Sequence, residues 1–272
     1  MNKKEIEVII QRIEKWYKSL YEMVVYDKIT FDAKFGWTDD HVSFNDKELL
    51  TYKPITEGEN WGKKWESAWF HLSSEIPKTH KGKTLATELD FSGEGLVFTP
   101  SGEIMQGITN GAIWDQNFLR TRVLLDEKFI ENDKVELWVE AAANSLFGVY
   151  TEENPEVESP KRHGWFDAKV EKIRFGIYDD DIWKLYLDAR ILLGLVKKLE
   201  ENSVRRHRAI LALNRCINAF SNSRVNAQKA RGYLKEELSK TAAPSDLTVS
   251  AIGHAHIDTA VSYTHLTLPT KA

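Results

Sequence analysis

The sequence predicts a mixed α and β protein with an antiparallel β-sandwich between an N-terminal helix and a helical linker. Three observations predict this class: an amphipathic start, a long series of short alternating runs, and a second helical region. The chain has 272 residues, 42% of them hydrophobic, and a formal net charge of -4. This composition is typical of a globular protein. The charge does not favour a nucleic-acid partner, which usually needs a basic surface.

Residues 1–29 form the first predicted segment, an N-terminal helix. Apolar residues recur there at spacings of three and four, as expected of an amphipathic helix: Ile6, Ile9, Ile13, Trp16 and Leu20. The scattered charges do not fit a secretory signal. No apolar run reaches the roughly 18–20 residues that would cross a bilayer. The single cysteine, Cys216, excludes an internal disulfide. We therefore expect a cytoplasmic protein with no membrane partner.

Residues 30–178 are predicted to form the β-sandwich. Alternating runs separated by Gly, Pro and Asn-Asp fill this region: ESAWFHLSSEI, KTLATELDF, EGLVFTPSGEIMQG, RTRVLLDE, DKVELWVEAAA and AKVEKIRFGIY. Each run fits a half-buried strand. Many strands at short spacing, without helices between them, indicate an antiparallel sandwich of jelly-roll type. Trp61, Trp65 and Trp69 lie four apart, and a core position is favoured over an exposed sugar-stacking platform.

Residues 179–243 are predicted to be a helical linker. Asp179 to Asp181 supply an N-cap and favourable charge at a helix start. Apolar residues then recur as far as Leu199, and two further helical patterns follow at roughly 204–220 and 223–240. The stretch TAAPSD ends the helical region.

Residues 244–260 carry the one motif with specific chemistry. LTVSAIGHAHID reads as a buried strand that ends in polar residues, and strand alternation places His254, His256 and Asp258 on one side. Imidazole nitrogen and carboxylate oxygen are zinc ligands. Sites in β/α barrels lie at the C-terminal ends of strands. The pattern favours the first strand of a truncated β/α barrel with a metal site over a polar strand end. An amidohydrolase-like barrel stays open on spacing alone.

The longer string SAIGHAHIDTA resembles the opening of the catalytic domain in α-mannosidases of glycoside hydrolase family 38. WGKKWESAWFHLSSEIP, LDFSGEGLVFTPSGEIMQGITNG and VELWVEAAANSLFG resemble segments of the N-terminal domain in the bacterial and cytosolic/vacuolar branch. The resemblance covers nearly all of residues 1–260. It implies a retaining exo-α-mannosidase with one catalytic Zn²⁺, acting on α-mannoside glycans. It also implies that His256 and Asp258 bind the metal, with His254 as a neighbouring support.

The resemblance ends after Ala260, where Val261 replaces the family's Trp. We expect residues 261–272 to be a non-native tail of the kind that adapter read-through produces, and His265 is given no role. The family's nucleophile, general acid and remaining zinc ligands lie downstream of the motif, so we expect no catalytic residue here and an inactive chain. A homo-oligomer is expected only for the full-length parent. Two alternatives stay open: a stand-alone carbohydrate-binding or oligomerisation module, and a truncated amidohydrolase-like metalloenzyme.

Overall fold

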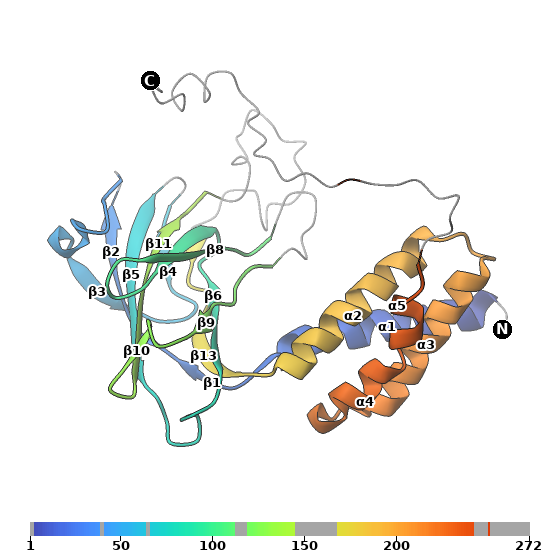
Figure 1. Cartoon of the computed structure of the whole chain (residues 1–272). Helices are drawn as coiled ribbons and strands as arrows, with labels where there is room; N and C mark the ends of the chain where they lie inside the picture. Colours follow the sequence, from blue (N-terminus) through green and yellow to red (C-terminus); the bar gives the residue numbers. More distant parts are fainter. Residues whose placement is uncertain are drawn as a thin grey trace, which may run out of the picture. The chain divides into compact units, whose positions relative to one another are not determined.

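A computed structural model describes residues 3–38, 41–63, 66–111, 119–144 and 168–241, together with Ser250 (Figure 1). Contacts group the chain into two units, Met1–Leu238 and Ser239–Ala272. The first unit contains the strands and helices that the structure describes. The predicted domain limits at residues 29, 178, 243 and 260 stay predictions.

Two antiparallel sheets make up the β-sandwich, which confirms the predicted fold class. The four-stranded sheet has the order β1 (Val25–Thr30), β13 (Lys172–Tyr178), β6 (Leu85–Asp90), β9 (Leu124–Leu125). The seven-stranded sheet has the order β3 (Tyr52–Ile55), β2 (Asp32–Thr38), β5 (Ser67–Glu75), β11 (Lys134–Ala142), β7 (Glu94–Phe98), β8 (Ile104–Thr109), with β10 (Ile130–Glu131) paired to β11. Strands β12 (Ala168–Lys169) and β4 (Asn60–Gly62) form a separate antiparallel pair.

The main core lies between the two sheets and follows from strand alternation. Phe70 on β5 and Leu137 on β11 are buried against Leu89 on β6 and Phe175 on β13. Side chains two apart on a strand share a face, so alternate positions of these strands enter the same core. Trp69, the neighbour of Phe70, belongs instead to a smaller apolar cluster.

Two of the three tryptophans predicted to lie in the core are buried. Trp61 donates its indole N–H to the carbonyl of Phe91 at 3.0 Å. Trp69 donates to the carbonyl of Val42 at 2.8 Å. Buried indoles need such partners, so both residues act as structural anchors. Trp65 lies outside the described residues.

The helices form a second core around α1 (Lys3–Met23). The other helices are α2 (Asp180–Lys198), α3 (Val204–Phe220), α4 (Ala227–Gly232) and α5 (Lys235–Leu238), with the 3₁₀ turn η2 (Arg224–Asn226). A separate 3₁₀ turn, η1 (Lys47–Leu49), lies between β2 and β3. The apolar face of α1 is buried through Ile13, Trp16 and Leu20, as its spacing predicts. Helix α1 contacts α2 and α3, although some 150 residues separate it from them. None of the described helices combines the length and apolar character needed to cross a membrane.

The helix boundaries agree with the sequence in two places and differ in one. Asp179 caps α2, accepting from the backbone N–H of Ile182 at 3.1 Å, and α3 begins and ends close to its predicted limits. A single helix over residues 223–240 is wrong. The segment divides into η2, α4 and α5, because Gly232 interrupts it and the Tyr233 N–H bonds to the Ala230 carbonyl, three residues back.

Candidate functional site

Outside the described residues lie the predicted zinc ligands His256 and Asp258, their predicted supporting neighbour His254, the predicted tail, and the predicted barrel strand apart from Ser250. Their assignment therefore stays a prediction. Within the described ranges, no group of three or more His, Cys, Asp or Glu side chains could hold a metal ion. The site chemistry that the structure does describe comes from charged side chains between α1 and the sandwich.

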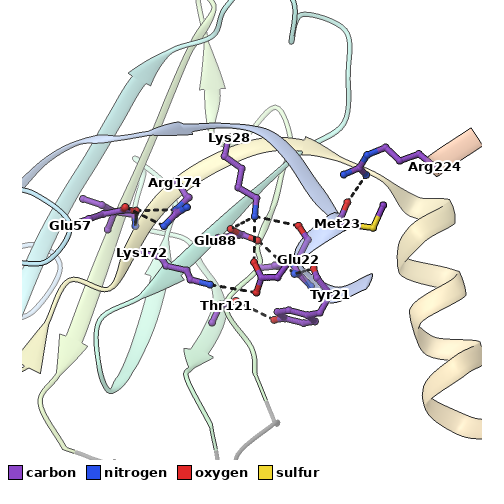
Figure 2. Close-up of polar contacts among 12 residues, drawn as sticks. Tyr21, Glu22, Met23, Lys28, Glu57, Glu88, Thr121, Lys172, Arg174 and Arg224 are labelled. Atoms are coloured by element: carbon purple, nitrogen blue, oxygen red, sulfur yellow. Dashed lines mark hydrogen bonds and ion pairs between the residues drawn. The ribbon is translucent and has the colours of Figure 1, made fainter. Parts of the chain in front are cut away.

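A cluster of charged side chains joins α1 to the four-stranded sheet (Figure 2). Glu88 on β6 is only 2% exposed, and its Oε2 lies 2.9 Å from Nζ of Lys28 on β1. The Nη2 atom of Arg122 lies 3.7 Å from the other carboxylate oxygen. Lys28 also approaches the Glu22 carboxylate at 3.7 Å, and Lys172 approaches it at 3.8 Å. We call Glu22, Lys28, Glu88, Arg122 and Lys172 the charge clamp.

Arg122 fixes the last turn of α1 from the sandwich side. Its Nη2 donates to the main-chain carbonyl of Tyr21, and its guanidinium carbon lies 3.5 Å from the centroid of the Tyr21 ring. The Tyr21 hydroxyl and Thr121 Oγ1 lie 3.3 Å apart within hydrogen-bonding distance. Burial raises the pKa of Tyr21 above its ordinary value of 10.0, and the Arg122 charge opposes that shift.

Two further arginines connect distant segments near the charge clamp (Figure 2). Arg174 on β13 makes a two-pronged contact with Glu57, at 3.1 Å from Nε and 3.2 Å from Nη2. Arg224 in η2 donates to the Met23 carbonyl and pairs with Asp179 Oδ2 at 3.1 Å. The end of α1, the start of α2 and η2 are thereby held together. Paired arginine forks give geometric specificity to such junctions.

The charge clamp is suited to holding the fold and not to acid–base chemistry on a substrate. Retaining glycosidases need two carboxyl groups on either side of the scissile bond. The two carboxylates of the clamp, Glu22 and Glu88, both contact Lys28. Sequence patterns miss this cluster, because its members come from separate elements and only the tertiary fold brings them together.

Beside the clamp lies a pocket of about 260 Å³ with aromatic walls. Tyr21, Tyr178 and Trp183 line it together with the polar side chains of Gln106 and Arg120. We call this the aromatic pocket. It combines ring surfaces with hydrogen-bonding groups, which is the usual character of a small-ligand site.

The β-sandwich corresponds to a known family. A family model of the Ams1-like type, described as the jelly roll domain of alpha-mannosidase, matches residues 29–174, more than half of the chain. The chain belongs to this α-mannosidase family. Membership confirms the resemblance inferred from the strand-region segments and favours an α-mannosidase origin over an amidohydrolase one.

The curated relatives that this chain matches are much longer than the chain itself. Alpha-mannosidase G of Dictyostelium discoideum is 28% identical over 266 residues, covering 94% of this chain and 24% of that protein. Alpha-mannosidase 2C1 of Mus musculus is 25% identical over 260 residues, covering 92% and 24%. Alpha-mannosidase 2C1 of Homo sapiens is 25% identical over 226 residues, covering 82% and 21%. The chain thus spans about a quarter of the length of these curated relatives.

Proposed function

We propose that this chain is the N-terminal part of a zinc-dependent, retaining exo-α-mannosidase that removes terminal α-mannose from glycans. The observation that carries the proposal is the family match over residues 29–174, together with relatives named alpha-mannosidase. A cytoplasmic location belongs to the proposal and is supported by the lone, buried Cys216, which needs no oxidising compartment.

The proposed metal ligands are His256 and Asp258, with His254 as a supporting neighbour. Their imidazole nitrogen and carboxylate oxygen are donors that zinc accepts. When bound in such a site, zinc supplies Lewis-acid stabilisation of the sugar hydroxyls. Two ligands do not complete a four-coordinate site, so we expect this chain to bind zinc weakly.

The chemical step needs more than these residues provide. A retaining glycosidase uses a nucleophilic carboxylate and a second carboxylic acid, about 5–5.5 Å apart. By family resemblance both belong to sequence downstream of the motif, which residues 261–272 do not resemble. The 272-residue chain is therefore proposed to be inactive by itself, with the sandwich and helices forming an accessory region of the enzyme.

Two measurements on the purified chain test this proposal. Hydrolysis of p-nitrophenyl α-D-mannopyranoside with added zinc should not exceed the buffer rate, and clear turnover would contradict the inactivity. Zinc binding, followed by competition with a colorimetric indicator, should weaken in His256→Ala and Asp258→Asn. The matched control is His265→Ala, which should bind zinc as the parent chain does. Equal weakening in all three variants would contradict the assigned ligands.

A further inference from the structure

We propose that the aromatic pocket binds a pyranose ring, so that this chain holds one sugar of a glycan through its N-terminal region. The pocket volume of about 260 Å³ suits a single sugar better than an extended chain. Its walls come from α1, β8, β13, α2 and the segment before β9, so the folded junction creates a site that no single segment contains.

A rigid stack of three rings supports one wall of the aromatic pocket. Tyr17 and Tyr186 stack at 4.7 Å and 11° between planes, and their hydroxyls form a 2.7 Å hydrogen bond. Tyr186 stacks in turn with Trp183 at 5.4 Å and 17°. Of these three rings, Trp183 is the one that lines the pocket. Its plane is therefore fixed in advance. The ring surface that is left beside Tyr186 and the Arg122 guanidinium, whose carbon lies 5.9 Å from the Trp183 centroid, would pack against the C–H face of a sugar ring.

Two polar side chains of the pocket lack a partner in the part of the chain that the structure describes. Among the described residues, neither the Tyr178 hydroxyl nor the Arg120 guanidinium has a hydrogen-bond or ion-pair partner. Gln106 donates through Nε2 to the Arg122 carbonyl at 2.8 Å, which orients its side-chain oxygen as an acceptor. Donors and an acceptor beside an aromatic face match the alternating hydroxyls of a pyranose.

The charge around the pocket also selects among ligands. Arg120 and Arg122 line it, and no carboxylate is among its described lining residues, so a cationic ligand is disfavoured. Burial raises the pKa of Tyr178 to about 12, with the nearby Asp180 charge adding to the shift. The Tyr178 hydroxyl is protonated near pH 7, as it would be at the ordinary tyrosine pKa of 10.0, and can donate to a sugar oxygen.

Ligand-observed NMR titrations of the full chain with methyl α-D-mannopyranoside test the inference. Trp183→Ala should weaken binding by at least about 10-fold, because the stacking surface is lost. Tyr178→Phe and Arg120→Ala each remove one hydrogen-bonding group and should weaken it by about 2- to 10-fold. The matched control is Trp37→Ala, which removes a 44% exposed tryptophan on β2 and should leave binding unchanged.

Circular dichroism of each variant separates loss of binding from loss of folding. If Trp183→Ala unfolds, Tyr178→Phe and Arg120→Ala still decide the matter, since neither side chain has a described partner to lose. Equal affinity in all variants, or no sugar binding by the parent chain, would overturn the inference. Displacement of the sugar by millimolar inorganic phosphate would also overturn it, by showing a simple anion site.

The choice of a mannoside as probe rests on the proposed function, so methyl α-D-glucopyranoside and methyl β-D-galactopyranoside are titrated in parallel. Binding of any of these pyranosides at Trp183 upholds the inference even if no mannosidase activity exists in a longer protein. Mannosidase activity without sugar binding by this chain overturns the inference and leaves the proposed function intact.

Discussion

Replacing Glu88 by Gln probes how strongly the charge clamp holds α1 to the β-sandwich. The substitution preserves the size of the side chain and removes its charge. Lys28 and Arg122 then lose the carboxylate that faces them at 2.9 Å and 3.7 Å. Both cations are largely buried, with side chains 21% and 11% exposed, so water can replace the lost partner only in part.

Removing one partner of a buried ion pair costs about 3–5 kcal/mol. Lys28 keeps a second carboxylate, Glu22, at 3.7 Å, which compensates part of the loss. We therefore expect Glu88→Gln to lower the free energy of unfolding by about 3 kcal/mol, the lower end of that range. The matched control is Glu14→Gln, which breaks a largely exposed 2.8 Å pair between α1 and Lys197 of α2. It should cost less than about 1 kcal/mol.

Urea unfolding followed by both far-UV circular dichroism and tryptophan fluorescence measures this difference. Coincident curves from the two probes would show that sandwich and helices unfold together, which makes the free energies comparable. A cost for Glu88→Gln no greater than that for Glu14→Gln would refute the view that the clamp couples the two regions.

Four further substitutions test other parts of the structure. Asp179→Ala removes the α2 N-cap together with the ion pair to Arg224 and should cost about 1–2 kcal/mol in urea unfolding; an unchanged midpoint would contradict both roles of Asp179. Gly176→Ala places a methyl group 2.4 Å from a main-chain oxygen and should cost about 1–3 kcal/mol, whereas Gly194→Ala meets open space inside α2 and should stabilise by up to about 1 kcal/mol. Thermal melting distinguishes the two glycine substitutions, because Gly176→Ala should lower the melting temperature and Gly194→Ala should raise it. Shifts of the same sign would contradict the surroundings assigned to these glycines. Burial raises the pKa of the Cys216 thiol to about 12, so the native protein should resist Ellman's reagent at pH 8 and react once unfolded. The pKa of Cys216 in the folded protein lies above the unfolded value of 9.0. The thiol therefore contributes fully to the folded state's stability below pH 9, and this contribution is lost as the pH rises toward 12 because only the unfolded chain ionises there. Cys216→Ala should reduce the loss of stability at alkaline pH. Rapid reaction of the native protein with Ellman's reagent would contradict the burial of this thiol.

Local patterns predict local structure well in this chain. Helix α3 matches its predicted limits because Ser203 caps it and its apolar residues repeat with helical period. Strand β5 matches because Phe70 and Leu72 alternate with the polar residues His71 and Ser73 in a run that the pattern identifies. The misjudged helix over residues 223–240 shows the limit, since a glycine and three-residue backbone bonds interrupt it without changing the apolar period.

Long-range contacts could not be predicted in the same way. Residues 28, 88 and 122 meet in the charge clamp only after β1 and β6 take places in one sheet. Residues 21, 178 and 183 likewise line one pocket only after α1 packs beside α2. The metal motif differs from these long-range contacts, because the two-residue spacing of its side chains can be seen directly in the sequence. His256 and Asp258 follow from that spacing and the family resemblance, and their role stays a prediction.

Hydrolysis of p-nitrophenyl α-D-mannopyranoside by a protein in which residues 1–260 are joined to the proposed catalytic domain tests the central proposal most directly. Such a protein should release p-nitrophenol in a zinc-dependent way, with the product keeping the α configuration in NMR. The activity should disappear in Asp258→Asn. Absence of hydrolysis with zinc present, or full activity in Asp258→Asn, would contradict the account.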